Sequence, residues 1–150
     1  MSVKTGTIKF YSLERVLAAA AAAICLILTA VIWVLVSRQQ EMWPMPALYF
    51  LEVVAASLVG LWGIFRADVP GSFLAWAVAG ALVGFAIMGG FSVGFFYLPV
   101  AGLLGLAALW QDRQAWRRLP LHLGIALLAA VAQAALMLAL VRVLYPNAAS

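Results

Sequence analysis

The longest apolar stretch of the chain runs from Val69 to Gln111 and contains no Asp, Glu, Lys, Arg or His. A helix rises about 1.5 Å per residue, so a continuous helix over this stretch would be about twice as long as the ~30 Å hydrocarbon core of a bilayer is thick. The pattern therefore predicts two membrane crossings with a turn between them. The turn is expected at residues 89–94, where glycine is densest, and Pro99 suits the first turn of the helix that follows.

Apolar runs separated by charged residues and prolines predict five transmembrane helices in all. They are expected at about 15–37, 47–65, 71–91, 95–111 and 120–144. The segments between them are short, so residues 1–150 are expected to form a single transmembrane helical domain with no soluble domain. Residues 1–14 mix apolar side chains with Lys4 and Lys9, which fits either a short interfacial helix or a solvated basic tail. The predicted fold class is an all-α integral membrane protein.

Composition agrees with a membrane protein, because 67% of the residues are hydrophobic and only 9% are charged, with a mean hydropathy of +1.11. The net charge of +4 comes from basic residues scattered at helix ends, so no nucleic-acid patch is expected. Cys25 lies in an apolar run and is interpreted as a small buried hydrophobe, since Ile24 before it disfavours lipid attachment. The run from Val16 to Val36 exceeds the ~7–15 residues of a cleaved signal core, which favours a signal anchor.

The basic residues in short flanking segments indicate an orientation. Arg38 and Arg142 lie at one side of the predicted bundle, and all other basic residues lie at the opposite side: Lys4, Lys9, Arg15, Arg66, Arg113, Arg117 and Arg118. Because positive charge favours the cytoplasmic side, the bias predicts a cytoplasmic N-terminus and an external C-terminus. The preference for Arg over Lys and the abundance of Ala, Leu and Gly suggest a bacterial plasma membrane.

Small residues at helical spacing predict where the helices pack, because close backbone approach drives helix association in lipid. The second predicted helix carries one such stripe on one face: Glu52, Ala56, Gly60 and Gly63. Further small-residue faces occur in the third, fourth and first predicted helices: Gly80 with Gly84, Gly102 with Gly105, and the alanines 18–23. These patterns predict close helix contacts, either within the chain or with another subunit.

Glu52 and Arg142 are the only ionisable residues expected within the predicted hydrocarbon region, where an unpaired charge costs several kcal/mol. One hypothesis is that they pair or share an intramembrane polar network with Gln133. The alternative is that each reaches the outer headgroups separately. Gln133 lies mid-helix and needs a hydrogen-bond partner such as Ser57 or Thr29, for packing or for lining a polar path.

His122 lies at the start of the fifth predicted helix and shares a helical stripe with Gln133. It is interpreted as an interfacial residue, although a lone histidine can also ligate a haem or a chlorophyll magnesium. The neighbouring basic residues Arg113, Arg117 and Arg118 could contact a lipid phosphate, or they belong to an ordinary cytoplasmic loop. The aromatic residues of the third and fourth predicted helices fit either pigment contacts or lipid contacts: Phe85, Phe91, Phe95, Phe96 and Tyr97.

The sequence contains no metal-ligand spacing, no nucleophile elbow, no phosphate-binding loop and no dinucleotide fingerprint. A catalytic role is therefore not expected, and the sequence leaves the presence of a cofactor open. The leading hypothesis is a non-catalytic small subunit or accessory protein of a larger membrane complex. Its expected partners are membrane lipids and either other membrane subunits or further copies of itself. The alternative is a small ion- or proton-coupled transporter or channel that uses Glu52, Gln133 and Arg142. A membrane enzyme acting on lipid or quinone fits less well.

Overall fold

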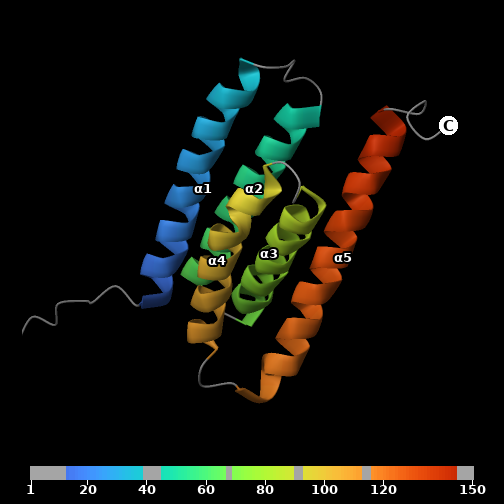
Figure 1. Cartoon of the computed structure of the whole chain (residues 1–150). Coiled ribbons are helices and arrows are strands. Elements are labelled where there is room, and N and C mark those ends of the chain that lie inside the picture. The colour runs from blue at the N-terminus through green and yellow to red at the C-terminus, as the bar shows by residue number, and fades with distance from the viewer. Residues whose placement is uncertain (1–12, 39–44, 67–68, 90–92, 113–115, 145–150) are drawn as a thin grey trace, which may run out of the picture.

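The computed structural model describes residues 13–38, 45–66, 69–89, 93–112 and 116–144, and this part of the chain is entirely helical apart from short turns (Figure 1). Five α-helices and two 3-10 helices follow one another in it: α1 (Leu13–Ser37), α2 (Met45–Arg66), α3 (Val69–Met88), η1 (Gly94–Tyr97), α4 (Leu98–Gln111), η2 (Trp116–Arg118) and α5 (Leu119–Leu144). The predicted helices are found with shifts of a few residues at their ends. The possible interfacial helix before α1 lies outside the described residues.

Four of the described helical segments are long and apolar enough to cross a membrane: Leu13–Ser37, Pro46–Arg66, Gly94–Gln111 and Leu119–Leu144. Ser72–Met88, within α3, is a shorter apolar segment. These lengths support a multi-pass membrane protein. The predicted turn is also confirmed, because α3 ends at Met88 and the Gly94 N–H donates a 2.9 Å hydrogen bond to the Gly89 carbonyl. Pro99 lies in the first turn of α4, as expected.

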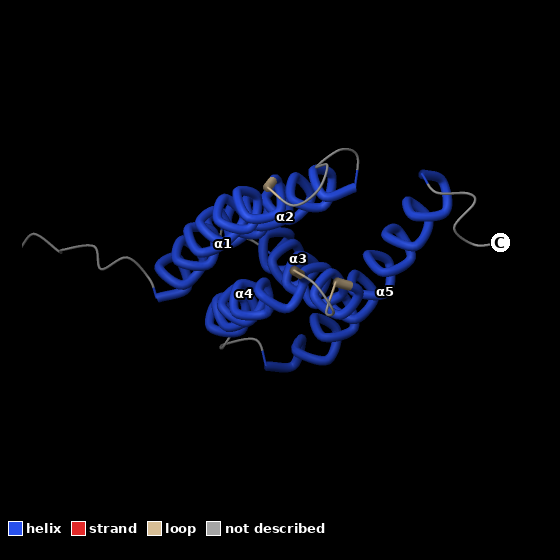
Figure 2. Tube along the Cα trace, turned by 45° about the horizontal axis from the view of Figure 1, so that its top comes forward, coloured by secondary structure: helices blue, strands red, loops and turns tan. Residues whose placement is uncertain are grey.

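The first four α-helices form an antiparallel bundle in which α3 is the central element. Helix α1 packs on α2 and α4, and α3 packs on α2, α4 and α5. Helix α5 lies on the outer side of α3, and its C-terminal half leans away from the bundle (Figures 1 and 2). We call the end of the bundle at which α1 begins the proximal end. There α2 and α4 end and α3 and α5 begin (Figure 1).

Small residues let α1 approach its neighbours closely. Ala18, Ala21 and Cys25 are fully buried on the face of α1 that enters the core, whereas Ala19 and Ala23 are exposed. On α2, a Cβ added at Gly60 would lie 3.0 Å from Val78 Cγ1 of α3 and 3.3 Å from Leu104 Cδ1 of α4. The small-residue stripe of α2 thus faces α3 and α4, and Ala56 and Gly63 share it.

The closest helix contact in the bundle joins α3 to α5. A Cβ added at Gly80 would overlap the Ala126 carbonyl, and one added at Gly84 would lie 2.5 Å from the Ala130 carbonyl oxygen. Two glycines spaced four apart therefore face two alanines with the same spacing. Because no side chain separates the helices here, their backbones are in direct contact.

Candidate functional site

The largest polar constellation in the described residues lies at the proximal end, where one carboxylate meets side chains from two other helices. We call Ser72, Trp76, Asp112 and His122 the Asp112 cluster. Ser72 Oγ lies 2.8 Å from both carboxylate oxygens of Asp112 and donates to them. Trp76 Nε1 donates to Asp112 Oδ2 at 2.9 Å, and His122 Nδ1 lies 2.6 Å from the same oxygen. The cluster joins the start of α3 and the start of α5 to the end of α4.

Chain order explains how these residues meet. Asp112 is the C-cap of α4, and its own N–H donates to the Ala108 carbonyl at 3.0 Å. Ser72 and Trp76 are one helical turn apart on α3, so they point to the same side of that helix. His122 lies in the first turn of α5. Because α3 and α5 begin where α4 ends, the three side-chain groups converge.

The Asp112 cluster is almost closed to its surroundings. His122 is 1% exposed, Ser72 is 5% exposed and Trp76 is 7% exposed, and the Asp112 side chain is 14% exposed. The His122 ring packs edge-on against Phe73 at 4.9 Å and lies 6.0 Å from the Trp76 ring. Donors surround the carboxylate, which offsets the several kcal/mol that a buried charge costs.

His122 lies near the start of α5, and its ring is buried inside the protein at the proximal end. Its close contact with Asp112 is not aligned as a hydrogen bond, and both ring nitrogens are buried without a hydrogen-bond partner among the described residues. Within the described residues, no group of three His, Cys, Asp or Glu side chains could hold a metal ion. The contacts that Asp112 makes with Ser72, Trp76 and His122 make the cluster a polar clamp between three helix ends.

A second polar contact crosses the bundle in its distal half. Gln133 Nε2 of α5 donates a 2.8 Å hydrogen bond to Glu52 Oε1 of α2, and both side chains are partly buried. Helices α2 and α5 do not pack on each other but lie on two sides of α3. The pair thus fixes the distance between two helices that share no direct backbone contact.

Of the three residues expected to form an intramembrane network, the structure brings together two. Arg142 is exposed on α5, and no ion pair joins it to Glu52 in the part of the chain that the structure describes. Gln133 bonds Glu52 and neither of its two expected partners, Ser57 and Thr29. Thr29 bonds the Tyr97 hydroxyl at 3.0 Å instead, and the buried Ser57 hydroxyl has no partner among the described residues. Cys25 is buried, as expected, with its thiol 3.7 Å from the Val53 carbonyl.

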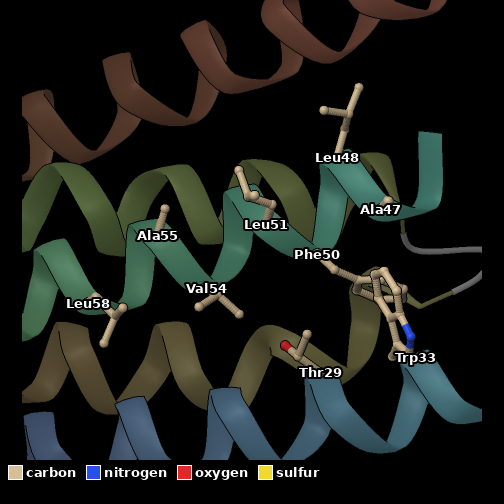
Figure 3. A pocket seen from close by; sticks show the side chains of 9 residues that line it. All are labelled: Thr29, Trp33, Ala47, Leu48, Phe50, Leu51, Val54, Ala55 and Leu58. Carbon is tan, nitrogen blue, oxygen red and sulfur yellow. The ribbon is translucent and has the colours of Figure 1, made fainter. Parts of the chain in front are cut away.

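Two apolar grooves of about 470 Å³ each open on the surface of the bundle. The first lies between α1 and α2, and Figure 3 shows the Trp33 and Phe50 rings together at one end of it, with centroids 5.8 Å apart. Thr29 and Trp33 are its lining residues with polar side-chain atoms, and the Thr29 hydroxyl is engaged by Tyr97. The second groove lies between α3, α4 and α5, and Gly102 and Gly105 line it. A Cβ added at either of these two glycines would meet no atom within 4 Å, unlike one added at Gly60, Gly80 or Gly84.

The basic residues proposed to contact lipid are partly described. Arg117 and Arg118 are exposed on η2 at the proximal end, and Arg113 lies outside the described residues. At the same end, the Arg66 guanidinium lies 4.7 Å from the Trp62 ring and the Arg15 guanidinium lies 5.5 Å from the Phe65 ring. Such pairs hold a cation beside an aromatic surface. The proximal end is therefore positively charged and rich in aromatic rings.

Comparison with known proteins gives no match to any family model and no significant similarity to a curated protein or a solved structure.

Proposed function

We propose that this protein is a non-catalytic small subunit of a larger membrane complex, with five transmembrane helices, and that α5 is the helix that packs against a partner subunit. Helix α5 packs on the bundle through one face only, which contains Ala126 and Ala130. A second face of α5 also carries small side chains, and all of them are exposed: Gly124, Ala132, Ala135 and Ala139. This second face is the observation that carries the proposal.

Small side chains on a helix surface favour contact with another helix, because lipid tails contact large apolar side chains equally well. The first small face of α5 shows this behaviour within the chain, where Ala126 and Ala130 meet Gly80 and Gly84. The second face points in another direction and stays uncovered in the single chain. A transmembrane helix of a partner subunit would bury it in the same way.

The proposed topology has a cytoplasmic N-terminus and an external C-terminus. The proximal end carries Arg15, Arg66, Arg117 and Arg118, whereas only Arg38 and Arg142 lie at the distal end of the described chain. Positive charge in short segments is retained on the cytoplasmic side. This distribution supports a cytoplasmic proximal end.

The test is gentle detergent extraction from native membranes, followed by sizing and mass spectrometry of the proteins that co-purify. We expect stoichiometric larger subunits with the natural chain and at least a tenfold loss of them with the double variant Ala135→Leu/Ala139→Leu, whose side chains would fill the exposed face. Ala23→Leu, at an exposed site on α1, is the matched control and should keep the partners. A natural chain that purifies alone, or a double variant that keeps its partners, would contradict the proposal.

The second candidate function is a small ion- or proton-coupled transporter, and the Glu52–Gln133 contact favours it. A carboxyl group inside a membrane helix is often part of a proton or ion pathway. Here it bonds an amide of a helix that leans away from the bundle, so movement of α5 would change the surroundings of the carboxyl.

We expect Glu52→Gln to abolish proton-coupled flux in reconstituted vesicles if this function holds. The replacement amide can still bond Gln133, so the thermal stability should change little, since intramembrane hydrogen bonds contribute about 0.6 kcal/mol on average. Equal flux in the natural and Glu52→Gln proteins would exclude this mechanism.

A further inference from the structure

The groove between α3, α4 and α5 has the shape of a site for one hydrocarbon chain. Helix α3 forms its floor, and α4 and α5 form its walls, with these lining residues: Trp76, Ala79, Gly80, Val83, Leu98, Ala101, Gly102, Gly105, Ala126, Leu127 and Ala130. A Cβ added at Gly102 or Gly105 would meet no atom within 4 Å. The side of the groove formed by α4 is thus open at Gly102 and Gly105, while α3 and α5 are in close contact on the other side.

The groove is long and apolar enough to hold part of an acyl chain. Its lining on α3 runs from Trp76 to Val83, which is about 10 Å along the helix axis at about 1.5 Å per residue. The groove volume is about 470 Å³. The polar side-chain atom of its lining is the Trp76 indole N–H, which is bonded to Asp112. The surface left for a ligand is therefore hydrocarbon, which suits an acyl chain.

Charged residues lie at the proximal end of the bundle, near the start of the groove-lining helices α3 and α5. Trp76 is the lining residue of α3 nearest to that end, and it bonds Asp112, whose carboxylate is surrounded by donors within the Asp112 cluster. Two exposed charges among the described residues lie on η2, directly before α5: Arg117 and Arg118. Ala126 of the groove lies eight residues beyond Arg118, or about 12 Å along a helix. Two exposed guanidinium groups thus precede the α5 wall of an apolar groove, on the proximal side of it.

We propose that an anionic phospholipid binds here, with one acyl chain in the groove between α3, α4 and α5 and its phosphate on Arg117 and Arg118. Guanidinium groups bind phosphate through paired, charge-assisted hydrogen bonds. Basic residues near a membrane surface also attract anionic lipids by about 1 kcal/mol each. The site lies within one chain and uses a different surface from the second small face of α5, so it does not depend on a partner subunit.

The experiment uses the purified full chain, stripped of lipid and titrated by native mass spectrometry with phosphatidylglycerol or phosphatidylcholine that carry the same acyl chains. We expect phosphatidylglycerol to bind at least tenfold more tightly. The double variant Arg117→Gln/Arg118→Gln should reduce phosphatidylglycerol binding to the level of phosphatidylcholine. Gly105→Leu should weaken the binding of both lipids at least fivefold, because its side chain would occupy the groove.

Ala23→Leu is the matched control, since Ala23 is exposed on α1 and does not line the groove. It should bind both lipids as the natural chain does, and circular dichroism should show that both leucine variants keep their helices. Equal binding of the two lipids by the natural chain would overturn the proposal. Tight phosphatidylglycerol binding that survives either the arginine double variant or Gly105→Leu would do the same.

Discussion

Replacing Gly80 with alanine is expected to destabilise the bundle by about 2 kcal/mol, although alanine is the better helix former by up to about 1 kcal/mol. The added Cβ would overlap the backbone carbonyl of Ala126, which cannot rotate aside as a side chain can. Helices α3 and α5 would have to separate along their whole contact. Reversible unfolding of the purified protein in mixed micelles measures the loss.

Gly102→Ala is the control for this prediction, because the new methyl group would meet no atom within 4 Å. It should leave the free energy of unfolding unchanged or raise it by up to about 1 kcal/mol through helix propensity. Gly84→Ala should fall between the two variants, since its Cβ would lie 2.5 Å from the Ala130 carbonyl oxygen. If Gly80→Ala and Gly102→Ala had the same effect, the close α3–α5 contact would be contradicted.

The glycines also show how far sequence patterns predict this fold. Glycine pairs in α3 and α4 both look like packing faces, but Gly80 and Gly84 contact α5, whereas Gly102 and Gly105 face an open groove. Helix positions follow from local apolar patterns and can be predicted. The choice of partner for each face depends on how α5 lies on α3, and alanine is so frequent in this chain that no pattern singles out Ala126 and Ala130.

The contacts of the polar residues could likewise be predicted only in part from the sequence. Glu52 shares the small-residue stripe of α2, so its direction towards protein could be predicted, but its partner Gln133 lies on a helix that does not pack on α2. Asp112 looked only like the end of an apolar stretch. One signal was available for it, because a tryptophan N–H within an uncharged helix needs an acceptor and Asp112 is the first carboxylate after that stretch. His122 then follows within the first turn of α5.

Asp112→Asn is expected to destabilise the protein by about 3 kcal/mol, as breaking a buried charged contact does. The amide keeps the size of the carboxylate but offers a single acceptor oxygen. Ser72, Trp76 and His122 all approach the carboxylate, so at least one of these buried groups would lose its partner. The same reversible unfolding experiment measures this loss.

A double-mutant cycle separates the clamp from a general effect of the lost charge. Ser72→Ala alone should cost about 1 kcal/mol, the usual contribution of one hydrogen bond and slightly more when the acceptor is charged. In the background of Asp112→Asn, the same change should cost clearly less, with a coupling energy between about 0.5 and 3 kcal/mol. Additive effects would mean that Ser72 and Asp112 act independently. The Asp112 cluster joins α3, α4 and α5 at the proximal end, whereas Gly80 and Gly84 meet α5 further along α3, so a positive coupling energy would assign the cluster its own share of the stability of this helix arrangement.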